Sequence, residues 1–174
     1  VYKRQVREKL NIARQFAENH PEYMVNVQAL ERVQPKDLDA SEIEARLGAT
    51  WISPDYITEF MAETLHTPRQ HINYERIKVQ YAEVTGQWNV KGKNVDSSNN
   101  PLSTATYGTQ RANAYRLLED ALNLRDTKIY DTIHDADGEH RVLNRKETTL
   151  AQQKQELIRE EFKEWIFCLL YTSD

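Results

Sequence analysis

Residues 77–90 read IKVQYAEVTGQWNV, and this stretch separates a mixed α+β chain from an all-helical one. From Ile77 onward, apolar and polar residues alternate, which is the period of a half-buried strand. The pair Thr85-Gly86 suits a tight turn, after which Trp88 begins the returning strand. The sequence therefore predicts a β-hairpin at this position.

Sequence on both sides of this hairpin has the apolar period of amphipathic helices. Ser53 and Asn144 are expected helix N-caps, and Gly48 is an expected left-handed helix exit. A second hairpin is expected around the turn at 135–138, and residues 91–106 read as an exposed polar loop. The predicted fold is α+β, a single domain of several amphipathic helices with two β-hairpins; helices are expected at 6–19, 23–33, 39–47, 54–65, 111–124 and 144–167, and the second pair of strands at 127–133 and 140–143.

The two ends of the chain are expected to be artefacts of DNA library preparation. One coding of residues 1–5, VYKRQ, is GTG TAT AAG AGA CAG, and one coding from Cys168 onward is TGT CTC TTA TAC ACA TCT. The two are reverse complements over most of their length and match a transposase-end adapter. We therefore expect residues 1–5 and 168–174 to be adapter-derived, and residues 6–167 to be a fragment of a larger protein.

Composition fits a folded domain and limits its chemistry. Hydrophobic residues make up 39% and charged residues 29% of the 174 residues, as in ordinary globular domains. The one cysteine, Cys168, lies in the expected adapter tail, so neither disulfides nor cysteine-ligated zinc is expected. The net charge of -4 disfavours a duplex-DNA clamp. No apolar run approaches the ~20 residues of a membrane span, and we expect a cytoplasmic protein that binds no membrane.

Signatures of common catalytic sites are absent from the sequence. None of the five glycines lies in GxGxxG or GxxxxGK[ST], the phosphate-binding patterns. GxSxG and HExxH are also missing, which removes the usual hydrolase and zinc-protease patterns. Asn100-Pro101 is followed by Leu102 and does not form the Asn-Pro-Pro-aromatic signature of adenine methyltransferases. We predict no catalytic residue, no metal ligand and no cofactor in this chain.

One acidic stretch is a metal-site candidate, although a turn explains it better. It contains the carboxylates and imidazoles of Asp131, His134, Asp135, Asp137 and His140, which are groups that bind divalent cations. On a strand, however, neighbouring side chains point to opposite faces. A hairpin turn rich in aspartate and glycine accounts for the same residues, and we interpret them in this way.

The first hairpin is a candidate site for single-stranded nucleic acid. Cations outnumber carboxylates there, and the aromatic residues Tyr74, Tyr81 and Trp88 lie among them. Cations with stacking aromatic rings suit single strands, but the same aromatic residues could pack a core, and packing is the favoured alternative. The candidate nucleic-acid-binding residues are Arg76, Lys78, Trp88, Lys91 and Lys93.

Several longer strings of sequence are shared with one protein family. They run in order along most of residues 6–167 and read VREKL at 6–10, VQPKDL at 33–38, LGATWI at 47–52, TYGT at 106–109, ANAY at 112–115, LED at 118–120 and KETTLAQQK at 146–154. Together they resemble the large helicase–methyltransferase proteins of bacterial mobile elements. In that family an adenine-specific DNA methyltransferase precedes a Swi/Snf-like helicase, and this chain resembles the segment leading into the helicase.

The resemblance implies a context and carries over no site residue, because the family's methyl-transfer and ATP-hydrolysis motifs have no counterpart here. It implies a non-catalytic accessory or connector segment, with methyltransferase and helicase domains as neighbours in the same chain. For the parent protein it implies DNA as a partner and ATP and S-adenosylmethionine as cofactors. The alternative is a DNA-engaging module that presents the hairpin around residues 76–93 to a single strand.

Overall fold

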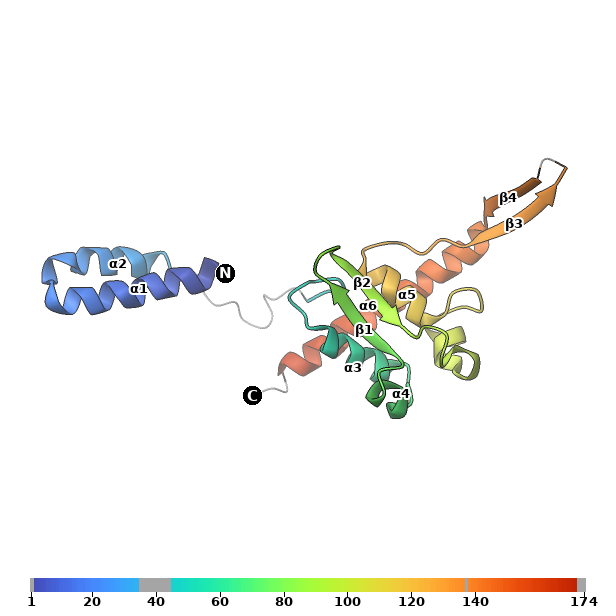
Figure 1. Cartoon of the computed structure of the whole chain (residues 1–174), viewed down its shortest axis with the longest axis horizontal. Helices are drawn as coiled ribbons and strands as arrows, with labels where there is room; N and C mark the ends of the chain where they lie inside the picture. The colour runs from blue at the N-terminus through green and yellow to red at the C-terminus, as the bar shows by residue number, and fades with distance from the viewer. Residues whose placement is uncertain (1, 35–44, 137, 172–174) are drawn as a thin grey trace. The chain divides into compact units, whose positions relative to one another are not determined.

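The computed structural model of the chain describes residues 2–34, 45–136 and 138–171. The chain divides into two compact units, residues 1–43 and 44–174 (Figure 1). The α+β class with two antiparallel hairpins is confirmed. Both hairpins lie in the larger unit. The first two helices, which we expected to belong to the same domain, form a compact unit of their own.

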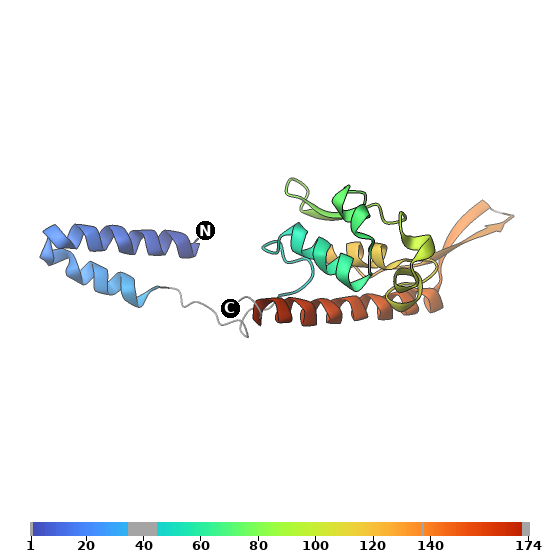
Figure 2. The ribbon, with the colours of Figure 1, turned by 90° about the horizontal axis from the view of Figure 1, so that it is seen from below.

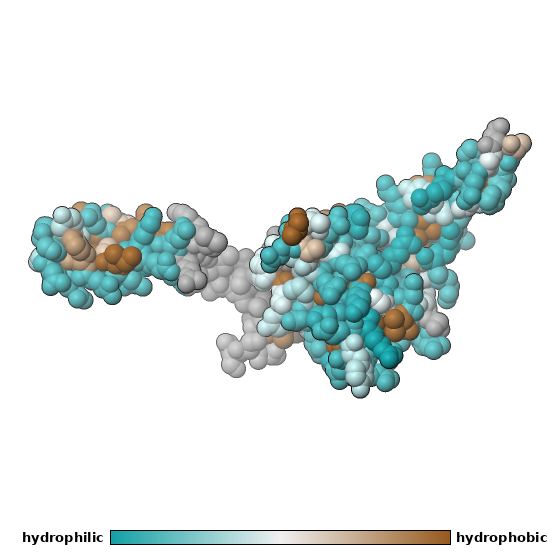
Figure 3. Space-filling model, in the orientation of Figure 1, coloured by the Kyte–Doolittle hydropathy of each residue, from teal (hydrophilic) through white to brown (hydrophobic). Residues whose placement is uncertain are grey.

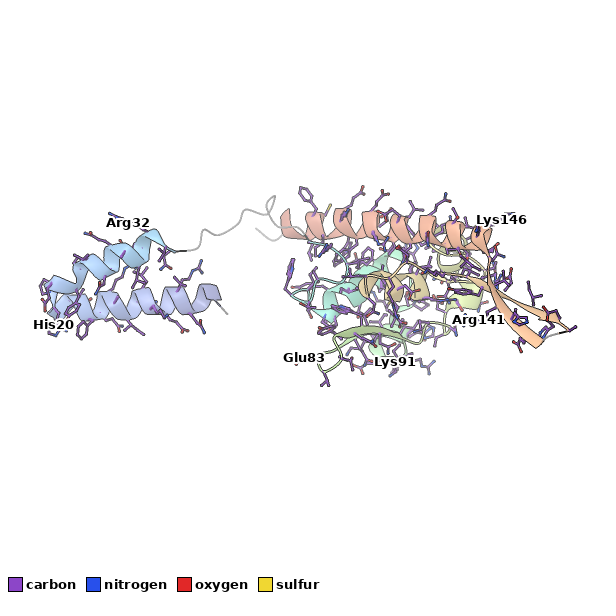
Figure 4. All side chains as sticks on the ribbon, turned by 90° about the horizontal axis from the view of Figure 1, so that it is seen from above. His20, Arg32, Glu83, Lys91, Arg141 and Lys146 are labelled. Carbon is purple, nitrogen blue, oxygen red and sulfur yellow. The ribbon has the colours of Figure 1, made fainter. Side chains whose placement is uncertain are left out.

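The smaller unit is a helical hairpin. It consists of α1 (Tyr2–Asn19), the 3-10 turn η1 (Pro21–Tyr23) and α2 (Met24–Arg32), with His20 at the turn between the helices (Figure 4). Leu10, Ala17 and Val27 are buried between the helices, as the apolar period predicts. The two helices predicted for this region are therefore confirmed. Apolar patches also appear on the visible surface of this unit (Figure 3).

The larger unit has three layers. The helix α6 runs along one side, α3 and α5 form the middle, and the hairpin β1–β2 covers the opposite side (Figure 2). A second ribbon, β3–β4, projects from one end (Figure 1). The bounds are α3 Pro54–Thr64, α4 Arg69–Asn73, β1 Lys78–Ala82, β2 Gln87–Lys91, α5 Ala114–Leu122, β3 Tyr130–Asp135, β4 Gly138–Leu143 and α6 Arg145–Tyr171.

Aromatic and branched side chains fill the space between the layers. Phe60 of α3 meets Phe162 of α6 edge-on, with ring centroids 5.0 Å apart, a favourable aromatic geometry. Tyr115 and Leu118 of α5 are buried beside them. The apolar stripes predicted for these three helices therefore face one shared core. No helix among the residues that the structure describes is both long enough and apolar enough to cross a membrane.

The predicted starts of α3 and α6 are confirmed by their capping residues, whereas α5 begins at Ala114, after its cap Asn113, and not at the expected residue 111. The Ser53 side chain accepts a hydrogen bond from the backbone N–H of Asp55, and Asn144 Oδ1 accepts one from the N–H of Glu147 at 3.0 Å. Gly48 has a left-handed φ of +88°, but it lies in a turn and does not end a helix. The helix expected at 39–47 is wrong over residues 45–47, which form loop and turn; its other residues lie outside the described ranges.

The expected exposed loop at 91–106 is in part buried and ordered. It contains a 3-10 turn η3 (Ser97–Asn99) and a π-helical turn η4 (Leu102–Thr106). The side chain of Asn100 is buried and donates to the carbonyl of Leu65 at 2.7 Å, beyond the last turn of α3. A buried carbonyl requires such a donor, which explains why a polar residue lies inside the fold here.

Candidate nucleic-acid interface

The hairpin β1–β2 is bound along both edges by side chains of the middle helices. On the β1 edge, Thr58 Oγ1 of α3 accepts from the backbone N–H of Val79 at 3.1 Å. On the β2 edge, Glu119 Oε2 of α5 accepts from the N–H of Val90 at 2.8 Å. Asn123 follows α5 and accepts from the N–H of Trp88 at 2.9 Å. Paired edges resist the addition of another strand, so the outer face of the hairpin is the surface left for a ligand.

Two of the predicted cations lie directly opposite each other on this outer face. Lys78 pairs in register with Lys91, and Lys91 lies on the side of the hairpin away from α6 (Figure 4). Like charges in such a pair repel each other, but Glu75 lies 2.8 Å from the Lys78 ammonium group. The hydrogen bond from Lys78, together with its charge and that of Lys91, lowers the pKa of the Glu75 carboxyl group. The outer face is therefore basic and partly neutralised by one carboxylate.

Trp88 does not belong to this face. Its side chain is buried against α5 and packs on Tyr81, with ring centroids 4.7 Å apart. A buried indole cannot stack on a nucleic-acid base, so the assignment of Trp88 as a binding residue is corrected and the packing alternative holds. The physical reason is strand alternation, because Val79, Trp88 and Val90 all point toward the helices.

Lys93 also has a structural role, as the ion-pair partner of Glu119. Its ammonium group lies 2.5 Å from Glu119 Oε2, the oxygen that also accepts from the Val90 N–H. Lys93 therefore neutralises a half-buried carboxylate that holds the hairpin to α5. Of the five predicted residues, Arg76 and Lys91 are exposed, while Lys78 is partly exposed and pairs with Glu75. Tyr74, near Arg76 in the chain, is 76% exposed.

The acidic stretch at 131–140 forms the second hairpin, as predicted, with β3 and β4 paired in antiparallel register. Asp131 binds Arg111 and accepts from Asn144 at 2.8 Å, while His140 lies 3.3 Å from Asp135 across the ribbon. His134 and Asp135 are consecutive residues of β3 and point to opposite faces. Asp137 lies outside the described residues. Within the described ranges, no three His, Cys, Asp or Glu side chains converge as a metal-binding group.

Comparison with known proteins places the larger unit in a family. A family model for a domain of unknown function, DUF8437, matches residues 46–169. The chain belongs to this family. No curated protein matches the chain, and no solved structure matches it. The DUF8437 region includes the hairpin β1–β2, the ribbon β3–β4 and nearly all of α6.

Two residues that position the hairpin of the DUF8437 region were missed by sequence reasoning. Glu119 and Asn123 lie four residues apart and so share one side of α5 and its C-terminal turn; both bind backbone groups of β2. The sequence signal for these two residues was their four-residue spacing, because the side of α5 that carries them adjoins its apolar stripe. A strand edge packed on that side requires acceptors for its free N–H groups.

Proposed function

We propose that this chain is a non-catalytic accessory or connector segment of a cytoplasmic DNA helicase–methyltransferase of a bacterial mobile element. In this proposal, ATP and S-adenosylmethionine are used by neighbouring domains of the same chain, and DNA is the partner of the whole protein. One observation carries the proposal. Several polar side chains in the strings that resemble the helicase–methyltransferase family bind backbone groups of other elements, so these strings maintain a fold.

The string at 146–154 and the residue just after it illustrate this role. Thr148 Oγ1 of α6 accepts from the backbone N–H of Ile129 at 2.9 Å. One turn later, Gln152 donates to the carbonyl of Thr127 at 3.3 Å, and Gln155 accepts from the N–H of the same residue. These side chains therefore hold residues 127–129, the segment before β3, against α6. They make no site where a reacting group could be held.

The strings at 112–115 and 118–120 have the same character. Asn113 donates to the carbonyl of Lys93 at 3.0 Å, and Glu119 accepts from the N–H of Val90 at 2.8 Å. The hydroxyl of Tyr115 lies 2.8 Å from Thr67 Oγ1 in the core. A scaffold selected for rigidity would keep such residues, which supports a positioning role between larger domains.

The sequence of the surrounding reading frame and an activity assay together test this proposal. A longer reading frame should encode an adenine methyltransferase before the segment and a helicase after it. The chain alone, incubated with DNA, ATP and S-adenosylmethionine, should transfer no methyl group and hydrolyse no ATP above a heat-denatured control. Different flanking domains would overturn the parental assignment, and turnover by the isolated chain would overturn the non-catalytic role.

A second function, single-stranded DNA binding by the hairpin, is supported by one specific observation. Arg76, Lys91 and the largely exposed Tyr74 are accessible. Lys78, which pairs with Glu75, lies across the strand pair from Lys91. Cations with an accessible aromatic ring suit a flexible nucleic-acid strand. Because Trp88 is buried and Lys93 is bound by Glu119, we place this function second.

A further inference from the structure

A pocket of about 380 Å³ lies on the larger unit, apart from the outer face of the hairpin. Its lining comes from three separate parts of the chain, the loop before α3, the C-terminal end of α5 and the second half of α6. The volume falls in the range of small-molecule sites, about 300 to 1,000 Å³. The lining residues are Arg46, Leu47, Ala121, Leu124, Arg159 and Lys163.

Among the residues that the structure describes, the polar part of this lining is cationic. Arg159 and Lys163 lie four residues apart on α6 and so project from one side of the helix, and Arg46 comes from the loop. Arg159 is neutralised and held in place by Asp126 at 3.2 Å and Glu156 at 3.0 Å. No carboxylate among the described residues forms an ion pair with Arg46 or Lys163, which leaves two positive charges available for an anionic ligand.

The apolar part of the lining includes a leucine in an unfavourable conformation. Leu124 has a φ of 56° and is 67% exposed, in the position after α5 where glycine or asparagine is the usual residue. Left-handed backbone is costly for a leucine, and such strain gathers at functional sites. Its side chain lines this pocket and also the neighbouring one of about 300 Å³ next to Gly48. An exposed, strained leucine beside cations suits a ligand that has an apolar body and an anionic group.

We propose that the pocket between Arg46, Leu124 and Lys163 binds a phosphate ester. Guanidinium groups match phosphate oxygens in a bidentate geometry, and lysine adds a mobile point charge. Leu47, Ala121 and Leu124 provide the apolar wall against which the organic part of the ester packs. The phosphate comes from a free nucleotide or from the backbone of a nucleic-acid strand. This site goes beyond the proposed connector function and does not depend on it.

Binding measurements on the full chain with three probes test the proposal. Calorimetry with AMP and with inorganic phosphate tests the free ligand, and fluorescence anisotropy with a single-stranded oligonucleotide tests the backbone source. The double variant Arg46→Gln/Lys163→Gln should weaken binding by roughly tenfold or more, because it removes two charge-assisted contacts. Binding should also weaken as salt is added. The matched control is Lys128→Gln/Lys146→Gln, which removes the same charge from exposed positions outside the pocket and should leave affinity unchanged.

A third variant separates binding from folding. Leu124→Gly removes part of the apolar wall and relieves the left-handed strain, so the chain should keep or gain thermal stability while AMP binds several-fold more weakly. Inorganic phosphate, which has no apolar body, should be affected less. AMP binding without oligonucleotide binding assigns the site to free nucleotides, and the reverse assigns it to the strand backbone. Absence of binding by all three probes at millimolar ligand, or binding unchanged in the Arg46/Lys163 variant, would overturn the proposal.

Discussion

Gln155 Oε1 accepts a hydrogen bond from the backbone N–H of Thr127 at 3.2 Å, and both residues are buried. The amide nitrogen of Gln155 donates to the carbonyls of Leu117 and Arg125 at 3.3 and 2.8 Å. One side chain of α6 therefore joins α5, the turn after it and the segment that enters β3. Buried backbone groups need partners, and here a single glutamine supplies three of them.

Replacing this glutamine should destabilise the larger unit. We expect Gln155→Leu to lower the free energy of unfolding by about 2 to 4 kcal/mol. The N–H of Thr127 and the carbonyl of Arg125 lose their side-chain partner, and the carbonyl of Leu117, which lies within α5, loses a second bond. The matched control is Gln153→Leu, at an exposed position of the same helix, which should change stability by less than about 0.5 kcal/mol. Urea unfolding of both variants measures the difference, and equal midpoints would contradict the role given to Gln155.

The hydroxyl of Tyr115 should make stability depend on alkaline pH. Burial raises the pKa of this hydroxyl above its usual value. A raised folded-state pKa means that the contribution is present below the unfolded value, about 10, and is lost as pH rises above it. Tyr115→Phe should unfold about 1 to 2 kcal/mol more easily at pH 7 and show a shallower loss of stability above pH 10. Tyr74→Phe, at an exposed ring, is the control; parallel pH curves for the wild-type chain and the Tyr115 variant would refute the prediction.

Asp131 should hold the base of the ribbon β3–β4 at neutral pH and release it in acid. Hydrogen bonds from Arg111 and Asn144 lower the pKa of the Asp131 carboxyl group. A lowered folded-state pKa gives a contribution that is present above the unfolded value, about 4, and is lost as pH falls below it. We expect Asp131→Asn to increase amide hydrogen exchange in β3 and β4 and to leave α3 and α5 unchanged. An unchanged exchange rate in the ribbon would show that other contacts anchor it.

The outer face of the hairpin gives a prediction about single-stranded DNA. At about 150 mM salt we expect dissociation constants no tighter than the range of non-specific complexes, roughly 10⁻⁴ to 10⁻⁶ M. If the hairpin makes the contacts, replacing Arg76, Lys78 and Lys91 with glutamine should reduce the slope of log K against log salt by about 0.7 for each lost contact. The Arg46→Gln/Lys163→Gln variant is the comparison in the same anisotropy assay. Binding that responds only to that second variant would remove the hairpin from consideration.

The two expected adapter tails should differ in their effect on stability. Removing residues 1–5 should cost less than about 0.5 kcal/mol, as for other surface changes, because Val6 and the buried pair Leu10 and Ala17 remain. Ending the chain at Phe167 should cost more, about 1 kcal/mol, because Leu169 packs partly buried against the core of the larger unit. Thermal unfolding of two chains, one ending at Phe167 and one ending at Leu169, isolates this contact. Equal melting temperatures for these two chains would show that the contact contributes nothing.

Periodicity and capping residues were enough to predict most of the elements. The alternation from Ile77 fixed the hairpin β1–β2, and Ser53 and Asn144 fixed the starts of α3 and α6. Both signals act within a few residues of the chain, so a sequence shows them directly. The helix expected at 39–47 is wrong over residues 45–47. Gly48, just after them, lies close to the carbonyl of Leu122, a tertiary contact that local patterns do not contain.

Buried polar residues and the cationic pocket could not be predicted in this way. Asn100 and Gln155 lie inside the fold because distant carbonyls need their amide groups, and a pattern of apolar residues marks such positions as exposed. Trp88 was removed from the candidate nucleic-acid-binding residues for a related reason. Strand alternation places Lys78 on the outer face of the hairpin and Trp88 on the face toward the helices. Arg46 and Lys163 are brought to one pocket only by packing of the loop before α3 near α6.

The length of α6 has a mechanical consequence for the larger unit. At 1.5 Å per residue, its 27 residues span about 40 Å, and the ribbon β3–β4 is joined to its first turn through Asn144. For a straight helix of this length, a tilt of about 10° displaces one end by roughly 7 Å relative to the other. The contacts of Phe162 and Trp165 with Phe60 and the hydrogen bond from Gln155 to Leu117 hold α6 against α3 and α5. A change in these contacts would therefore move the ribbon β3–β4 at the first turn of α6.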